Sequence, residues 1–525
     1  MRYILLILLQ FLSFRGLSQQ VQNIVPDSTF SNDGLLLFNF FNNIDRGYGV
    51  AIQPDQKIIM VGLSKRPSTG FFELCFVRLN PDGTPDSSFN FDGFTNVGLG
   101  DQQSIGGQTP SVKLDNQGRI VALCSGGLPG TSGLDMFVCR LLPDGTIDNS
   151  FGLSGVRTVD MTGAFTQPDL GSAFDIDIYG NIYIVGACRV GFTPIDNDFA
   201  LVKINSSGNL SNDFDQDGKK LFNPTGAAEF ATGVVCLPNG RFIFGGKAGA
   251  NVMLVMMDST GALVNSFNGV GAVTIPGQSI ENPIITLDSQ GRILLGVSTS
   301  SGTIVIYRYL QNGSVDATFG LNGNYVFNIG SPSVLTSIGF QSDQKIILGG
   351  YSGSSTSSDF LAVRLDSTGT LDLTFNSTGY KTQSIASSVS PEEANGMGIM
   401  NDDRILLAGT VIFSSAINED LGMVMLKVQS TISTGIPSVG QVSTKIYPNP
   451  FDDEGINIEL QLMQATSLRF DFYDVYGRLV STSIRDVPSG ANTINFSDFQ
   501  MSSGVYTISI ISGDTNIGNY KIVKK

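Results

Sequence analysis

None of the 525 residues of this chain is a histidine, and the chemistry that remains possible includes carboxylate catalysis and oxygen-ligated Ca²⁺. Nucleophilic catalysis by Ser–His–Asp or Cys–His groups, acid–base catalysis by histidine and imidazole metal ligation are therefore excluded. Asp175 and Asp177 flank Ile176, and the two-residue period of a strand would place both carboxylates on one face. Such a pair could bind Ca²⁺ or act as an acid and a base, whereas acidic residues beside a turn are the simpler interpretation.

Another acidic segment, Asp215-Gln-Asp-Gly218, resembles the start of a calcium-binding loop. No glutamate occupies the twelfth position that such a loop needs, so the segment is predicted to be a turn. We predict no cofactor, with Ca²⁺ as the one that the residue types leave open.

The five cysteines are the remaining reactive side chains. None belongs to a Cys-x-x-Cys arrangement, so a thiolate zinc site is unsupported, and all lie in apolar, strand-like runs. Buried free thiols are the favoured interpretation. A bridge between Cys124 and Cys139, in neighbouring strands of one repeat, is the alternative. The five are Cys75, Cys124, Cys139, Cys188 and Cys236.

The composition excludes a nucleic-acid-binding surface. The chain has 31 basic and 46 acidic side chains, a formal charge of -15, and phosphate binding requires clustered Lys and Arg. Its 41% of hydrophobic residues is ample for a packed core. Its 62 glycines, with only 15% charged residues, are typical of many short strands joined by tight turns.

A recurring phrase reveals the elements that must position these residues. A strand-like run ends in a residue that is usually basic, a glycine follows five residues later, and a phenylalanine follows six residues after the glycine. Constant spacing within the phrase and variable spacing between copies are typical of stacked structural repeats. The copies begin at Arg78, Arg140, Lys203, Met256, Arg308 and Arg364.

A hairpin signature, two β-rich runs joined by Asn, Asp or Gly residues, precedes the phrase and occurs seven times. One repeat therefore holds four short antiparallel strands, which cannot bury both faces alone but can do so when packed radially in a β-propeller. Within the phrase, the glycine is expected to occupy a turn position, and the phenylalanine is expected to be buried between neighbouring blades. The basic residue is expected to form an ion pair with an aspartate of a turn.

The two ends of the repeat region complement each other. The segments Pro26–Phe30 and Gly34–Phe40 form the tail of a repeat, and the seventh copy, which ends at Met423–Val428, lacks that tail. Pairing of the two pieces would remove exposed sheet edges. We therefore predict an all-β chain with a seven-bladed β-propeller closed by an N-terminal strand, followed by a small C-terminal β-sandwich.

The chain is predicted to have four parts. Residues 1–18 read as a secretory signal peptide, with Arg2 before a short apolar run and small residues near Gln19, and no other segment is long and apolar enough for a membrane span. Residues 19–429 form the predicted propeller, 430–443 a Ser/Thr/Gly linker, and 444–525 a separate β module.

The phrase Pro-Asp-Gly-Thr-Ile-Asp-Asn-Ser-Phe-Gly at 143–152 resembles the delta-60 repeat family of bacterial surface and secreted proteins. The resemblance covers roughly residues 24–429. It implies the propeller fold, and it implies no shared catalytic residues that can be placed on this sequence.

The C-terminal motifs look like the type A C-terminal sorting domain of the type IX secretion system of Bacteroidetes, over residues 445–525. The resemblance implies that the secretion machinery is a partner and that the protein is secreted or attached to the outer-membrane surface. The motif residues would act in recognition and turn formation: Tyr447, Pro448, Asn449, Pro450, Asp474, Gly477, Arg478, Gly504, Tyr506, Lys521 and Lys524.

Two functions are consistent with these observations. The favoured one is a noncatalytic surface propeller with a binding or scaffold role, whose ligand would be a glycan or a protein held by the loops between second and third strands. The alternative is a propeller enzyme, a carboxylate- or Ca²⁺-dependent lyase or hydrolase acting on polysaccharide. The loops expected to be long are 125–135, 189–198, 351–359 and 410–421.

Overall fold

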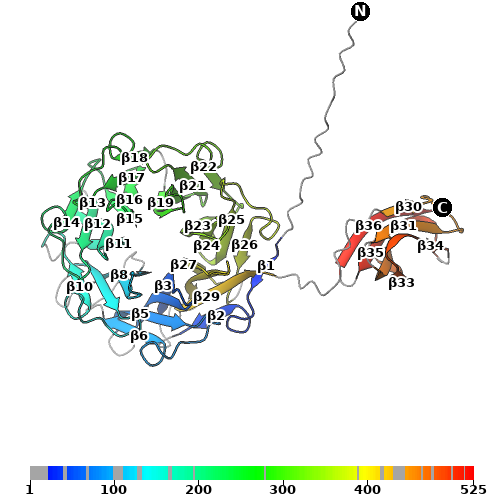
Figure 1. Cartoon of the computed structure of the whole chain (residues 1–525), viewed down its shortest axis with the longest axis horizontal. Coiled ribbons are helices and arrows are strands. Elements are labelled where there is room, and N and C mark those ends of the chain that lie inside the picture. Colours follow the sequence, from blue (N-terminus) through cyan, green and yellow to red (C-terminus); the bar gives the residue numbers. More distant parts are fainter. Residues whose placement is uncertain are drawn as a thin grey trace, which may run out of the picture. The chain divides into compact units, whose positions relative to one another are not determined.

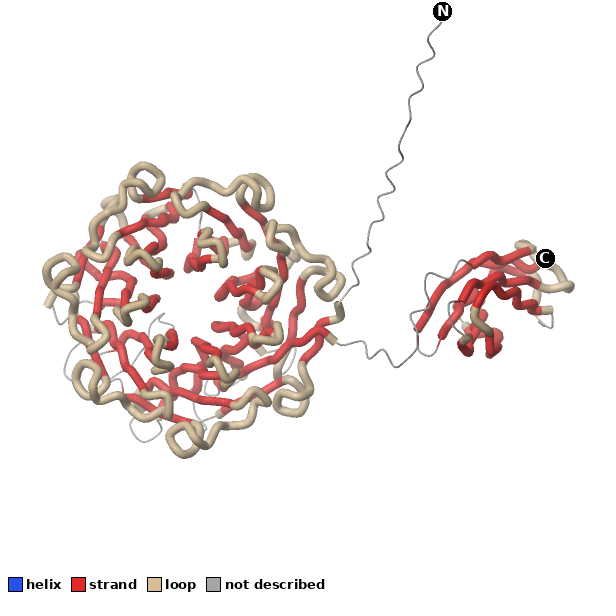
Figure 2. Tube along the Cα trace, in the orientation of Figure 1, coloured by secondary structure: helices blue, strands red, loops and turns tan. Residues whose placement is uncertain are grey.

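The structure is a computed structural model, and its described residues form two compact units, Met1–Gln429 (unit 1) and Ser430–Lys525 (unit 2). All regular structure in these residues is β-strand, which confirms the predicted all-β class (Figure 2). They include no helix with the length and hydropathy to cross a membrane. The described residues are 22–39, 44–66, 70–98, 110–126, 133–163, 168–192, 195–276, 280–386, 390–413, 419–429, 444–462, 465–474, 478–497, 501–512 and 515–525.

The predicted signal peptide and linker lie outside these residues.

The described part of unit 1 contains seven antiparallel sheets. Sheet 1 comprises β3 (Asp45–Ile52), β4 (Ile58–Lys65), β5 (Phe72–Leu79) and β6 (Phe94–Gly98); sheet 2, β7 (Ser111–Leu114), β8 (Ile120–Gly126), β9 (Asp135–Leu141) and β10 (Val156–Val159); sheet 3, β11 (Asp169–Ile176), β12 (Ile182–Phe192), β13 (Ile195–Ile204) and β14 (Lys219–Phe222). Sheet 4 comprises β15 (Glu229–Cys236), β16 (Phe242–Ala248), β17 (Asn251–Met257) and β18 (Ala272–Ile275); sheet 5, β19 (Ile280–Leu287), β20 (Ile293–Thr299), β21 (Ile304–Tyr309) and β22 (Asn324–Phe327). Sheet 6 comprises β23 (Ser333–Phe340), β24 (Ile346–Ser354), β25 (Ser357–Leu365) and β26 (Tyr380–Gln383); sheet 7, β27 (Glu392–Ile399), β28 (Ile405–Ile412), β29 (Glu419–Val428), β1 (Ile24–Pro26) and β2 (Leu35–Phe38).

Figure 1 shows the sheets of unit 1 around a central axis, with the first strand of each sheet innermost and the last strand at the rim. Because neighbouring strands are antiparallel, the connections between first and second strands and between third and fourth strands lie at the same end of the sheets. We call this end the turn face. The opposite end, which carries the connections between second and third strands and from one sheet to the next, is the loop face.

Two of the predicted long loops on the loop face are extended hairpins instead. β12 pairs with β13 as far as Phe192 and Ile195, and β24 pairs with β25 as far as Ser354 and Ser357. Because the backbone pairing continues through both segments, they lengthen the strands of sheets 3 and 6. The central parts of the other two predicted loops, 127–132 and 414–418, lie outside the described residues.

The middle strands are hydrophobic at nearly every position because the sheets pack against each other on both faces. All seven residues of β8 and all seven of β9 are buried. One apolar cluster joins Val61 and Phe76 of sheet 1 to Ala122 and Cys139 of sheet 2. All five cysteines are free and four are buried, so the prediction of buried free thiols is confirmed and Cys124 is not bridged to Cys139.

The fixed spacing of the repeated phrase has a packing origin. Phe89 is fully buried against Gly145 of the next sheet, where an added Cβ would lie 2.6 Å from the ring and where φ is 87°. Each phrase thus receives one ring at its glycine and supplies the next ring through its phenylalanine. The equivalent pairs are Phe30–Gly83, Phe151–Gly208, Phe214–Gly261, Phe267–Gly313 and Phe319–Gly369.

In sheets 1, 2, 5 and 6 the basic residue of the phrase forms what we call the repeat ion pair, with a carboxylate eight residues later; in sheet 3, Lys203 pairs with Asp213, ten residues later (2.7 Å), and in sheet 7 the N-terminal segment supplies the carboxylate. In sheet 2, the buried Arg140 donates through Nε to Asp148 (2.7 Å), lies over the Phe151 ring (4.5 Å to its centroid) and donates to the carbonyl of Ser206 in the next sheet (2.6 Å). The guanidinium therefore links neighbouring sheets while its charge stays paired. The same pair is present in Arg78–Asp86, Arg308–Asp316 and Arg364–Asp372.

Sheet 7 is assembled from both ends of unit 1. β1 and β2 pair antiparallel with β29, as predicted for the N-terminal segment and 423–428. Asp27 is the carboxylate of this sheet's repeat ion pair, and it accepts hydrogen bonds from Lys427 and Arg404. Burial raises the pKa of Asp27, but these hydrogen bonds and that from the backbone of Thr29 hold the pKa well below its ordinary value.

Unit 2 has two sheets in its described residues. A mixed apolar cluster contains Ile458 and Phe496 from the first sheet and Phe470 and Ile508 from the second. The rings of Phe470 and Phe496 meet edge to face, with centroids 5.0 Å apart. The first sheet comprises β30 (Thr444–Tyr447), β31 (Ile456–Leu462) and β34 (Gly490–Phe496), and the second β33 (Leu479–Val487), β32 (Thr466–Tyr473), β35 (Gly504–Ser512) and β36 (Thr515–Lys524).

Candidate binding pocket

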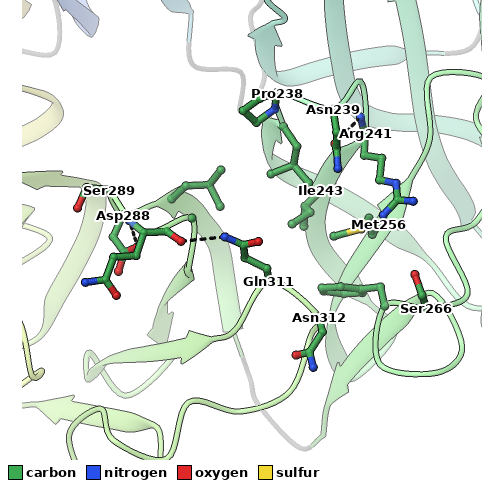
Figure 3. A pocket seen from close by; sticks show the side chains of 15 residues that line it. Pro238, Asn239, Arg241, Ile243, Met256, Ser266, Asp288, Ser289, Gln311 and Asn312 are labelled. Atoms are coloured by element: carbon green, nitrogen blue, oxygen red, sulfur yellow. Dashed lines mark hydrogen bonds between the residues drawn. The ribbon is translucent and has the colours of Figure 1, made fainter.

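A pocket of about 720 Å³ opens on the turn face between sheets 4 and 5. Figure 3 shows Arg241 and Met256 on the sheet 4 side, with Asp288 and Gln311 from sheet 5 across from them. Apolar side chains such as Ile243 line its sheet 4 wall, and amide and hydroxyl groups come from the turns. An apolar lining with a few convergent polar groups is typical of ligand sites.

The pocket lies where sheet 4 has an uncharged residue in place of each member of the repeat ion pair. Met256 occupies the position of the basic residue, and Val264, eight residues later, occupies that of the carboxylate. In sheet 5, by contrast, the guanidinium of Arg308 fills this space, donating to Asp316 (2.8 Å) and to the carbonyl of Ser367 (2.7 Å). The shorter, uncharged methionine leaves that space open between sheets 4 and 5.

Arg241 is left with no ionic partner by the same change. The residue before the second strand is basic in most sheets and adds a second charge to the carboxylate of the repeat ion pair, as Arg292 does to Asp316 (3.7 Å). Arg241 occupies the position of Arg292 in the repeat, is exposed, and takes part in no ion pair with a described residue. The pocket therefore carries an unneutralised guanidinium at its rim.

The charge of Arg241 reaches Asp258 only weakly. The pKa of Asp258 is raised by burial and lowered overall by hydrogen bonds from Thr260 and Ala262, with Arg241 as the smallest of these influences. The guanidinium therefore remains available to an anionic group from outside.

The pocket offers a single carboxylate among its lining residues. Asp288 Oδ2 pairs with Arg292 Nε at 2.6 Å, and Oδ1 accepts a hydrogen bond from the backbone N–H of Gln290 (2.9 Å). Glycoside hydrolysis normally uses two carboxyl groups, one of them free to transfer a proton.

The carboxylates of Asp175 and Asp177 have different hydrogen-bond partners and different structural roles. Asp175 links three sheets, because its carboxylate accepts hydrogen bonds from Lys113 Nζ (2.7 Å) and from the backbone N–H of Cys236 (2.6 Å). Asp177 caps the β11–β12 turn by accepting from the backbone and side chain of Asn181 (both 2.8 Å). Protein donors occupy both carboxylates, so we do not propose them as a metal site.

The segment that begins at Asp215 is a turn, as predicted. Asp215 and Gln216 have φ values of 46° and 78°, and Asp215 Oδ1 pairs with Lys220 Nζ at 2.7 Å. Asp217 accepts the backbone N–H of Lys219 (2.9 Å), which fixes the start of β14.

In unit 2, the two ends of the predicted sorting motif lie side by side. Asn449 donates to the carbonyl of Lys521 and accepts from the N–H of Val523, both at 2.9 Å. Both Tyr447–Pro448 and Asn449–Pro450 peptide bonds are cis. Residues separated by about 70 positions in sequence thus form one local surface.

The other sorting-motif residues stabilise turns and strand ends. Arg478 donates from its backbone and from Nε to Asp474 (3.0 and 2.8 Å) across the β32–β33 turn, where Gly477 lies outside the described residues. Tyr506, two residues after Gly504, donates to the carbonyl of Ser502 (2.8 Å). Lys524 pairs with Asp453 at 3.0 Å.

Comparison with protein families gives a match for each of the two units. Residues 445–525 match the family described as secretion system C-terminal sorting domain, which is the family expected from the motifs. Four segments of unit 1, 53–89, 130–151, 289–319 and 341–375, match a domain of unknown function that forms a β-propeller. The chain carries a β-propeller and a secretion-system sorting tail. This tail indicates that the protein is secreted or attached to the outer surface. The delta-60 name for the repeats stays a prediction.

Solved structures resemble this propeller protein at the level of the fold only. A protein of unknown function from Dyadobacter fermentans is 10% identical, with a TM-score of 0.41, over 78% of this chain and 99% of its own. The polysaccharide lyase Uly1 is 10% identical, with a TM-score of 0.41, over 73% and 90%. The arabinofuranosidase Arb93A from Fusarium graminearum is 10% identical, with a TM-score of 0.35, over 77% and 97%. No curated protein matches the sequence significantly.

Sequence reasoning missed the pocket of the propeller, although a signal was present. It placed function on the connections between second and third strands, whereas the pocket lies on the turn face. The signal was Met256 at a position that is otherwise basic. A break in a repeat marks a site that the repeat's own packing does not fill.

Proposed function

We propose that the protein is a noncatalytic binding protein of the cell exterior, whose turn-face pocket holds an anionic group of a glycan or peptide. The observation that carries this proposal is the replacement of the repeat ion pair by Met256 and Val264, which opens the pocket and leaves Arg241 unpaired. A guanidinium binds carboxylate, sulfate or phosphate groups with two parallel hydrogen bonds. The apolar wall would contact the uncharged part of the same ligand.

The architecture proposed for this role is a closed seven-bladed propeller followed by a sandwich. The seven sheets of unit 1 would be the blades, with β1 and β2 as the closing strands, and the two sheets of unit 2 would pack face to face over their shared apolar cluster. Residues 19–429 and 444–525 would be the two domains, with the linker at 430–443. The two walls of the pocket belong to different sheets. A closed ring would fix these sheets relative to each other and so keep the pocket open.

We further propose that the secretion machinery recognises the surface where residues 447–451 meet 521–525. The hydrogen bonds of Asn449 to the last strand hold the two motifs in one arrangement. Replacing Asn449 by alanine removes both bonds, and we expect the protein to accumulate inside the cell envelope. Fractionation of cells that express this variant and the wild type would measure the change; normal surface delivery would contradict this role.

The pocket proposal is tested with the full chain on a glycan array that includes uronate, sulfated and neutral glycans, together with a pull-down of acidic peptides. The matched variant is Met256→Arg with Val264→Asp, which rebuilds the repeat ion pair and fills the pocket with the repeat's own residues. We expect its binding signal to fall at least about tenfold, with a Tm no lower than that of the wild type.

Two single variants test whether binding depends on an arginine in the pocket or on arginine at this repeat position in any sheet. Arg241→Gln should weaken acidic ligands because it removes the unpaired guanidinium. Arg119→Gln changes the equivalent residue of sheet 2, which pairs with Asp115 at 2.6 Å, and should leave binding unchanged. Equal binding by the wild type and the filled-pocket variant would refute the proposal. Turnover of a polysaccharide by the wild type would favour the alternative, an enzyme.

A further inference from the structure

A second feature, on the loop face, departs from the repeat in a different way. In several sheets, the residue after the fourth strand is an asparagine or serine beside the start of the third strand. Asn223 donates its amide to Asp198 (2.8 Å) in sheet 3, and Asn39 donates to Asp420 (2.6 Å) in sheet 7. In these sheets a donor faces each half-buried carboxylate, so its acceptor is satisfied.

Sheet 2 has a carboxylate where those sheets have the amide. Asp160 directly follows β10, and the pairing of Val159 with Met136 places it beside Asp135, the first residue of β9. The carboxylates of Asp135 and Asp160 therefore meet at a position where sheets 3 and 7 pair a carboxylate with an amide donor. Oδ1 of Asp160 accepts the backbone N–H groups of Thr162 (3.0 Å) and Gly163 (2.6 Å).

A third carboxylate reaches this point from sheet 3. Asp169, the first residue of β11, is 1% exposed, and one oxygen each of Asp135, Asp160 and Asp169 lies within 4.8 Å of the others. Asp169 Oδ2 accepts the N–H of Met161 (2.6 Å), but the buried Oδ1 accepts no hydrogen bond of ordinary geometry from the described residues. A buried acceptor with no partner costs about 1–3 kcal/mol in the general case.

The neighbouring groups do not supply the missing charge. Lys219 of β14 donates to the carbonyl oxygens of Asp160 and Met161 (3.1 and 3.2 Å) and acts on Asp169 only through its charge. The thiol of Cys188, opposite Asp169 in the ladder, is a weak donor. Burial, followed by the charges of Asp160 and Asp169, raises the pKa of Asp135 to about 6.

We propose that Asp135, Asp160 and Asp169 bind a divalent cation, Ca²⁺, and that this ion joins sheets 2 and 3 on the loop face. The cation would be coordinated by Oδ1 of Asp169, whose one neighbouring donor among the described residues is the weakly interacting thiol of Cys188, and it would neutralise the two carboxylates of sheet 2. Carboxylate oxygens without nitrogen or sulfur ligands suit Ca²⁺, and water can complete its coordination. The site is independent of the turn-face pocket and of the function proposed for it.

The test uses the full chain stripped of metal and titrated with CaCl₂, with calorimetry and the thermal unfolding of unit 1 as readouts. We expect one bound Ca²⁺ with a Kd of about 10⁻⁴–10⁻³ M, as in other extracellular modules, and a rise in Tm on saturation. In Asp160→Asn, which restores the amide of the other sheets, affinity should fall at least about tenfold. Its metal-free Tm should equal or exceed that of the wild type, because a repulsion is replaced by a donor.

Two further variants keep the result interpretable. Asp135→Asn should lose the Ca²⁺ response as well, and it serves if Asp160→Asn does not fold. Asp359→Asn changes the equivalent of Asp135 in sheet 6, beside Ser384 and Glu392, and should keep the full response. The proposal is overturned if the wild type shows no Tm shift in millimolar CaCl₂, or if both sheet 2 variants respond like the wild type.

Discussion

Replacing Phe89 by alanine should lower the free energy of unfolding of unit 1 by about 3–5 kcal/mol. The ring is fully buried, fills the space against Gly145 of the next sheet, and carries the guanidinium of Arg78 at 4.7 Å from its centroid. Its removal leaves a cavity between two sheets and also removes the surface on which the arginine lies. Chemical denaturation of the full chain, followed by the unfolding of unit 1, measures the change.

The matched control lies two residues away. Phe91 is 91% exposed in the same segment, so Phe91→Ala should change the free energy of unfolding by no more than about 0.5 kcal/mol. The pair of variants separates the packing role of the phrase from the general effect of losing an aromatic ring. Equal effects of the two substitutions would contradict the role of Phe89 as the contact between sheets.

The second large effect is expected at the place where the chain ends meet. Asp27→Asn keeps the shape and the hydrogen-bond acceptor of Asp27 but removes its charge. Lys427 then has no carboxylate partner among the described residues, and Arg404 keeps only its exposed partner Asp402 (2.9 Å). Because Asp27 is 1% exposed, we expect a loss of about 3 kcal/mol, at the lower end for a broken buried pair since both cations are partly exposed. Thermal or denaturant unfolding at neutral pH measures it.

The pH dependence of this effect has a defined sign. The pKa of Asp27 is lower in the folded chain than its ordinary value of 3.8, so the stability from its charge is complete above that value and is lost as the pH falls below it. The wild type should therefore lose its advantage over Asp27→Asn in acid. Asp33→Asn, an exposed residue of the same segment, is the control and should show neither effect.

Much of the fold could be predicted because it is encoded locally. The turn residues before each second strand adopt positive φ where the sequence has residues that tolerate it, such as Gly118, Gly240 and Asp403. Alternation and apolar runs gave the strands, and the complementary chain ends gave the pairing of β2 with β29. Extended hairpins such as β24–β25 were read as loops because their tips are rich in Ser and Gly, although ladder pairing continues through them.

The candidate sites depend on contacts between sheets, which local patterns do not contain. Asp135, Asp160 and Asp169 are spread over two repeats, and only the register of β9 with β10 and the packing of sheet 3 on sheet 2 bring them together. Met256 was visible as an exception, but its consequence depends on the space that a guanidinium occupies in the other sheets. The sequence therefore showed which positions depart from the repeat, but it did not show which side chains from other sheets surround those positions.

The position of β29 determines how unit 1 carries mechanical load. This strand has β28 on one side and β1 and β2 on the other, so hydrogen-bond ladders hold it along both edges just before the chain leaves the ring at Gln429. A force applied through unit 2 has to break two ladders at once before the strand can slide out. The two N-terminal strands β1 and β2 thus set how strongly unit 1 of a surface-attached molecule would resist unravelling from its C-terminal end.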